Sequence, residues 1–63
     1  MNAYQDCPIG STVMGTSFSG EEIRGEVTGY GIKNGKQVID IRSYKDAESR
    51  WLYRYQITQV IYE

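Results

Sequence analysis

The sequence predicts an all-β domain, a small barrel of five short strands with one helical turn before the last strand. Residues 23–44 have the pattern of two strands joined at residues 33–36, which is the strongest structural pattern in the chain. The other runs of β-branched and aromatic residues are short and are bounded by turn-forming residues. No window shows apolar residues at helical spacing over three turns. Strands are therefore expected throughout.

The elements are expected in a simple order along a single domain of residues 10–63. Residues 1–9 are predicted to form a flexible N-terminal arm, because Pro8 and Gly10 punctuate its end. The further elements are a first strand at 11–18, a turn at 19–22, the long hairpin, a polar turn at 45–50, a fourth strand at 51–55, a helical turn within 56–59 and a last strand at 60–62.

Two loops are able to close the long hairpin, and they give different registers. A two-residue loop of Asn34 and Gly35 would mix apolar and polar residues on both faces of the hairpin. A three-residue loop at 33–35, with Gly35 in the left-handed conformation as a bulge, places Val27 opposite Ile41 and separates the faces. The second register is therefore predicted.

This register assigns each hairpin residue to a face of the sheet. The inner face would carry Ile23, Gly25, Val27, Gly29, Ile39 and Ile41. The outer face would pair Arg24 with Tyr44, Glu26 with Arg42, Thr28 with Asp40 and Tyr30 with Val38, and Ile32 would lie opposite Lys36 at the tip. Opposite charges then face each other across the strands, which favours the pairing.

The runs IGSTVMGT, IRGEVTGY, KQVIDIRSY and WLYRYQITQVI carry a resemblance to a known family. Over about residues 9–61 they resemble the Tudor and KOW-type branch of SH3-like barrels. The resemblance implies an SH3-like barrel, and barrels of this kind host many unrelated roles. Tudor-type modules use an aromatic cage to bind methylated side chains, but no cage pattern is recognisable in this sequence.

Composition argues against an enzyme and against a metal or cofactor site. The chain has no histidine, the side chain most often used as a general base. Its one cysteine, Cys7, lies beside Pro8 and is expected to be an inert thiol, since one thiol with scattered carboxylates is no zinc ligand set.

Length and cysteine content also suggest where the chain works. A lone cysteine suits a reducing compartment, and no signal peptide or membrane span is recognisable, so a cytoplasmic protein is expected. Sixty-three residues lie near the lower size limit for independent folding, so a homodimer is an alternative to a monomer. The small size is in the style of phage and bacterial small proteins.

Aromatic residues give the main functional indication: six tyrosines, one tryptophan and one phenylalanine. Leu52 is the natural inward residue of its strand, so alternation places Trp51 and Tyr53 outside. The predicted partner-binding surface consists of Tyr30, Tyr44, Trp51, Tyr53, Arg24 and Arg42. The opposite parity, with both aromatics in the core, stays open; a buried Tyr53 would then need a hydrogen-bond partner.

Three functions are compatible with this surface. The leading hypothesis is a non-catalytic adaptor or inhibitor that docks on another protein, because Tyr, Trp and Arg are enriched in interaction hot spots. The first alternative is nucleic-acid or ribonucleoprotein binding through the same aromatics, with Arg42 and with Lys33, Lys36, Lys45, Arg50 and Arg54 as basic residues. The second alternative is homo-oligomerisation through the aromatic face.

Overall fold

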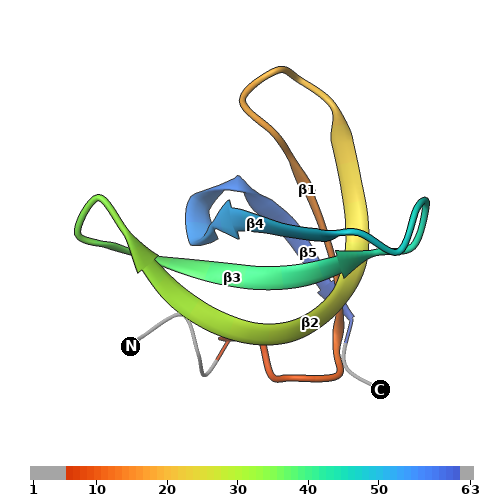
Figure 1. The fold of residues 1–63 in the computed structure, drawn as a ribbon, viewed down its shortest axis with the longest axis horizontal. Coiled ribbons are helices and arrows are strands. Elements are labelled where there is room, and N and C mark those ends of the chain that lie inside the picture. Colours follow the sequence, from red (N-terminus) through yellow and green to blue (C-terminus); the bar gives the residue numbers. More distant parts are fainter. Residues whose placement is uncertain (1–5, 62–63) are drawn as a thin grey trace.

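The computed structural model describes residues 6–61 and shows an all-β chain (Figure 1). Its elements are β1 (Thr12–Thr16), β2 (Glu22–Lys33), β3 (Lys36–Ser43), β4 (Ser49–Tyr53), the 3-10 helix η1 (Arg54–Gln56) and β5 (Ile57–Ile61). The strands form one antiparallel sheet in the order β4-β3-β2-β1-β5. Five strands and a helical turn before the last one confirm the predicted fold class.

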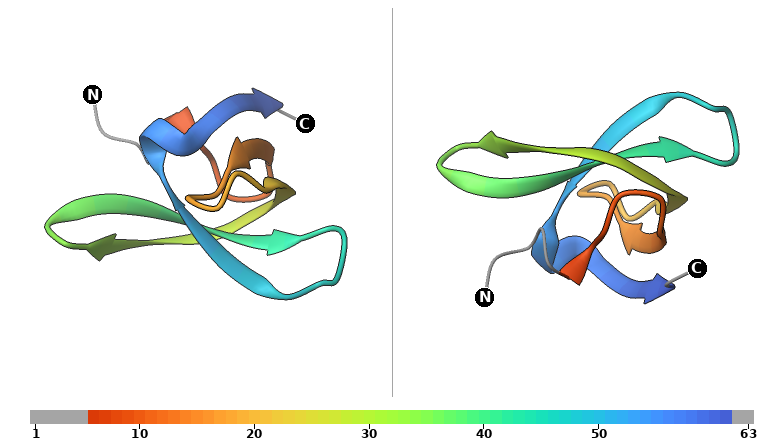
Figure 2. Two further views of the ribbon diagram at one scale, coloured as in Figure 1. Left: turned by 90° about the horizontal axis from the view of Figure 1, so that it is seen from above. Right: turned by 90° about the horizontal axis from the view of Figure 1, so that it is seen from below.

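The sheet is strongly curved, but in the described residues it is not closed into the barrel that the sequence predicted. Strand β2 is long enough to pair with β1 over its first half and with β3 over most of its length, and it bends between the two (Figure 1). Figure 2 shows the β2–β3 hairpin and β5 on opposite sides of the molecule. Among the described residues no ladder joins the edge strands β4 and β5, because β5 pairs with β1 after the turn of η1.

The helical turn comes two residues earlier than predicted, and Gln56 explains its position. The side-chain Oε1 of Gln56 accepts a hydrogen bond from the backbone N–H of Tyr53, which closes the turn of η1. Its Nε2 donates to the carbonyl of Thr16 at 3.0 Å and ties the turn to β1. This buried glutamine ends β4 at Tyr53 and starts β5 at Ile57, earlier than the predicted strand boundaries.

The core lies on the concave side of the sheet and follows the predicted alternation. It is built from Val13, Ile23, Val27, Ile39, Ile41, Leu52, Ile57 and Cys7. Gly25 is also buried. Gly29, which was predicted on the same inner face, is only half-buried. Leu52 faces this core as expected, which settles the parity of β4 in favour of an outward Trp51.

The described part of the expected N-terminal arm, residues 6–9, packs against the sheet. Cys7 is fully buried in the core, and its carbonyl accepts a hydrogen bond from the hydroxyl of Tyr30 at 2.7 Å. The following Gly10 donates its N–H to the carbonyl of Val27 at 2.9 Å. Residues 1–5 of the expected arm lie outside the described residues.

The tip of the long hairpin is a two-residue loop, so the predicted three-residue loop is wrong. Asn34 and Gly35 both have positive φ, at 53° and 75°, and Lys33 pairs with Lys36. Two central residues of positive φ are the requirement of a type I′ turn, which Asn-Gly satisfies best. Gly35 is therefore left-handed, as predicted, but it is a turn residue and not a bulge.

A bulge in β2 restores the predicted register farther from the tip. The pairing shifts by one residue between Val27 and Gly29, which leaves Thr28 as the extra residue. Before the bulge, Val27 pairs with Ile41 and Glu26 with Arg42, as predicted. The bulge thus reconciles a turn that favours one register with a core that favours the other.

Beyond the bulge the predicted pairs are wrong by one position. Tyr30 pairs with Ile39, Gly29 with Asp40 and Ile32 with Gln37, in place of the expected partners Val38, Ile39 and Lys36. Tyr30 consequently lies on the concave side, where it packs against the core. Val38 faces the opposite side and pairs with Gly31.

Replacing Gly35 with valine is expected to destabilise the fold by about 1–2 kcal/mol, the cost of a left-handed backbone for a side chain with a Cβ. A Cβ at Gly35 would meet nothing within 4 Å, so the whole effect is conformational. Urea unfolding followed by Trp51 fluorescence measures it. Gly35→Asn is the control, because asparagine tolerates this conformation. Equal stability of the valine and asparagine variants would contradict the turn assignment.

The burial of Cys7 predicts an unreactive thiol in the native protein. Desolvation raises the pKa of this thiol; the Arg54 guanidinium opposes the rise and Asp6 adds to it. Labelling by a maleimide is therefore expected to be slow in the native state and fast in urea, since the thiolate is the reactive form. Native labelling at the unfolded rate would contradict the burial.

The same raised pKa links stability to pH. The folded chain holds the thiol proton more tightly than the unfolded chain, so the stability that this provides is lost as the pH rises above the ordinary thiol pKa. Urea unfolding at a series of alkaline pH values, compared with Cys7→Ser, measures this contribution. A Cys7→Ser variant whose stability has the same pH dependence as the wild type would contradict it.

Candidate functional site

Four aromatic side chains gather on the convex side of the sheet, and we call them the aromatic surface: Phe18, Trp51, Tyr53 and Tyr55. Trp51 and Tyr53 alternate with the buried Leu52 on β4, which directs both away from the core. Tyr55 follows in η1, and Phe18 comes from the β1–β2 loop. Three separate elements therefore contribute to one surface.

Tyr53 is the centre of the aromatic surface. Its ring centroid lies 5.9 Å from Phe18, 5.3 Å from Trp51 and 5.6 Å from Tyr55. The first two contacts are edge-on and the third is stacked, at an interplanar angle of 8°, which are favourable arrangements for aromatic pairs. Its hydroxyl accepts a hydrogen bond from Nδ2 of Asn34 at 2.7 Å.

The four rings differ in solvent exposure: one is buried and three are exposed. Tyr53 is only 6% exposed, whereas Phe18, Trp51 and Tyr55 are 73%, 39% and 65% exposed. Tyr53 is thus outward-facing and yet buried, covered by rings and not by the core. The hydrogen bond from Asn34 satisfies the hydroxyl that this burial would otherwise leave unpaired.

A small apolar cluster lies beside Tyr53 on the same face of the sheet. Val38 is its cross-strand partner and is fully buried, although it does not belong to the main core cluster. On the other side of Val38, β2 contributes Gly31, where a Cβ would come within 3.4 Å of the Val38 side chain. The sheet therefore has a second, smaller apolar cluster on its convex side.

Two lysines from the hairpin tip lie over exposed rings. The Nζ of Lys33 is 5.4 Å from the ring centroid of Trp51, and the Nζ of Lys36 is 5.9 Å from that of Tyr55. Both distances are within the range of cation–π attraction. An open pocket adjoins Tyr55 and is lined by Asp6, Lys36, Gln37, Tyr53, Arg54, Tyr55 and Ile57.

The predicted binding residues divide between this surface and other places. Trp51 and Tyr53 belong to it, whereas Tyr30 lies on the concave side because of the Thr28 bulge. Tyr44 is exposed near the start of the β3–β4 loop, where its hydroxyl shares a 2.8 Å hydrogen bond with that of Thr12.

Arg24 and Arg42 are both exposed, and no ring contact of the aromatic surface involves either of them. The carbonyl of Arg24 accepts the backbone N–H of Tyr44 at 3.0 Å, and Arg42 lies opposite Glu26 on the neighbouring strand. The expected single face of Tyr30, Tyr44, Trp51 and Tyr53 is therefore not formed.

Two members of the aromatic surface were not predicted from the sequence. Tyr55 continues the spacing of Trp51 and Tyr53, and this spacing would have been enough to include it. Phe18 lies in the β1–β2 loop, 35 positions before Tyr53, and no local pattern marks it as a neighbour of β4. Only the curvature of the sheet brings it to Tyr53.

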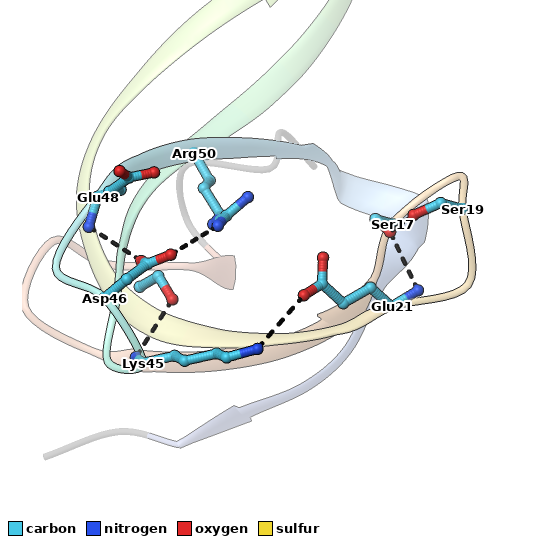
Figure 3. A network of polar contacts seen from close by, with 8 residues as sticks. Ser17, Ser19, Glu21, Lys45, Asp46, Glu48 and Arg50 are labelled. Atoms are coloured by element: carbon cyan, nitrogen blue, oxygen red, sulfur yellow. Dashed lines mark hydrogen bonds and ion pairs between the residues drawn. The ribbon is translucent and has the colours of Figure 1, made fainter.

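The basic residues of the β3–β4 loop and the start of β4 lie beside acidic side chains (Figure 3). Arg50 donates to Asp46 at 2.8 Å, and Lys45 lies 3.9 Å from Glu21 of the β1–β2 loop. The backbone N–H of Glu48 and the Arg50 guanidinium hold the pKa of Asp46 below its ordinary value. Each of these two cations therefore has a carboxylate within ion-pair distance.

Neither a metal-binding cluster nor a membrane-spanning helix is found among the described residues. Within residues 6–61 no group of three or more His, Cys, Asp or Glu side chains is placed to hold a metal ion. The same residues contain no helix with the length and apolar character needed to cross a bilayer. No family model, curated protein or solved structure matches the chain.

Proposed function

We propose that this chain is a small non-catalytic binding domain that docks on another protein through the aromatic surface. The observation that carries the proposal is the group of three exposed rings, Phe18, Trp51 and Tyr55, held in place by the buried Tyr53. Large exposed apolar groups gathered at one place mark interaction sites, and Trp and Tyr are the residues most enriched in binding hot spots.

The rigidity of this surface supports a role in binding. Phe18, Trp51 and Tyr55 each contact Tyr53, whose cross-strand partner is the buried Val38. Asn34 fixes the central ring by a hydrogen bond. Side chains that are already ordered lose less entropy when a partner binds, so more of the contact energy appears as affinity. The fold supports the same role, since five strands, a long bent hairpin and one helical turn are what we expect of an SH3-like binding domain.

Nucleic-acid binding is the weaker alternative for this surface. Arg50, Lys45 and Arg54 are each paired with a carboxylate, and the chain carries a formal net charge of −1. Affinity for nucleic acid depends on cations that neutralise phosphates, so paired cations give little of it. An adaptor or inhibitor of another protein, working in a reducing compartment with its single thiol buried, remains our proposal.

The test compares two exposed tyrosines. The wild type, Tyr55→Ala and Tyr44→Ala serve as baits in lysates of the source cells, and the affinity for a captured partner is then measured with purified proteins. Tyr55→Ala is expected to weaken binding by about 2 kcal/mol or more. Tyr44→Ala, which removes a ring outside the aromatic surface, is expected to change it by less than about 0.5 kcal/mol.

Two results would contradict the proposal. A partner whose affinity depends on Tyr44 and not on Tyr55 would move the site to the other end of the sheet. Light scattering that shows a dimer in the wild type and a monomer in Tyr55→Ala would assign the aromatic surface to self-association.

A further inference from the structure

The charge next to the aromatic surface indicates which kind of partner fits it. Lys33 and Lys36 are cross-strand partners beside the hairpin turn, so two ammonium groups start from the same end of the convex face. Like charges directly opposite each other in a sheet are unfavourable. The two side chains diverge, one toward the Trp51 ring and the other toward the Tyr55 ring.

Among the described residues, the acidic side chains are paired with other cations or lie away from these two lysines. Glu21 and Asp46 are paired within the loop network of Figure 3, and Glu26 lies opposite Arg42. Asp6 lies 3.8 Å from Arg54, so those two charges offset each other beside the Tyr55 pocket. Asp40 lies opposite Trp51, farther from the hairpin tip than either lysine.

The lysines also decide what the exposed rings are able to bind. A cation from a ligand, such as a basic or methylated side chain, would compete with Lys33 and Lys36 for the faces of Trp51 and Tyr55 and would be repelled by their charge. Nucleic-acid bases would need the same ring faces for stacking. A carboxylate beside the rings would instead meet two ammonium groups and relieve their mutual repulsion.

We propose that the aromatic surface binds an acidic peptide segment of a partner protein, one whose aromatic or aliphatic anchors contact Phe18, Trp51 and Tyr55 while its carboxylates pair with Lys33 and Lys36. This inference rests on the proposed function and adds the class of partner. The apolar contacts supply most of the affinity, and the lysines supply selection for acidic over basic sequences.

The experiment is a selection of random linear peptides, displayed on phage, against the whole chain, with Tyr55→Ala as the counter-selection. Peptides that combine Asp or Glu with aromatic or aliphatic residues are expected to be enriched. Affinities of synthetic copies are then measured for two matched variants, Lys36→Glu and Lys45→Glu. Both reverse the charge of an exposed lysine, but only Lys36 adjoins the aromatic surface.

Lys36→Glu is expected to weaken binding of the acidic peptides by about tenfold or more, whereas Lys45→Glu should leave it within about twofold. Enrichment of neutral or basic peptides, or equal effects of the two variants, would overturn the acidic partner and leave docking on a protein intact. Failure to enrich any peptide that distinguishes the wild type from Tyr55→Ala would overturn the proposed function as well. Competition of the selected peptides by single-stranded oligonucleotides would overturn the inference in favour of nucleic acid.

Discussion

Replacing Gly25 with alanine is expected to destabilise the fold by about 3 kcal/mol or more, enough to leave much of the chain unfolded. A Cβ at this position would lie 2.3 Å from the carbonyl oxygen of Arg42 and 2.8 Å from its carbonyl carbon. Both are backbone atoms, so no side chain is able to rotate out of the way. A domain of this size has only a few kcal/mol of stability in total.

The position of Gly25 in the sheet prevents a cheap adjustment. It pairs with Val13 of β1 on one side and with Ser43 of β3 on the other, at the part of β2 that both neighbours share. Moving β2 away from Arg42 would therefore disturb two ladders at once. The absent side chain is what lets the sheet curve this tightly.

Gly29→Ala is the matched control on the same strand. A Cβ there would meet only a carboxylate oxygen of Asp40, at an ordinary contact distance of 3.7 Å. Urea unfolding of both variants, followed by Trp51 fluorescence, should show a large loss for Gly25→Ala and a change below about 1 kcal/mol for Gly29→Ala. Similar midpoints for the two variants would contradict the close approach of β2 and β3.

The core was predictable because alternation of apolar residues is strong wherever one face of a strand is buried. Ile23, Val27 and Ile41 face the core as their spacing predicts, and Leu52 does the same on β4. The sequence also marks the turn, since Asn34-Gly35 is a preferred type I′ pair. What the sequence does not mark is the bulge at Thr28, because threonine is an ordinary strand residue.

That one extra residue explains the main error in the predicted site. A bulge changes the face of every residue beyond it on its own strand, so Tyr30 moved to the concave side, whereas Val38 of β3 kept its predicted outer position. Trp51 and Tyr53 kept their predicted direction, because β4 is anchored by Leu52 and contains no such shift. Phe18 joins them through a contact between a loop and a distant strand, which local patterns do not record.

Replacing Tyr53 with alanine is expected to cost about 3 kcal/mol and to abolish binding at the aromatic surface. Tyr53 is buried among Phe18, Trp51 and Tyr55, so its removal leaves a cavity and takes away the contact that the three exposed rings share. It also removes the large side chain opposite Val38 in the β3–β4 ladder. Stability is measured by urea unfolding, and the order of the rings by near-ultraviolet circular dichroism.

Two further variants separate the roles of the Tyr53 ring and its hydroxyl. Tyr53→Phe keeps the ring contacts and removes only the hydrogen bond with Asn34, so it should cost about 1 kcal/mol and keep the circular dichroism of the ring cluster. Tyr55→Ala removes an exposed ring and should cost less than about 1 kcal/mol while still weakening binding. A Tyr53→Ala variant as stable as Tyr55→Ala would mean that Tyr53 does not support the surface. The expected order, with Tyr53 needed for folding and Tyr55 only for binding, would show that the convex face carries a supported binding site and not a chance gathering of rings.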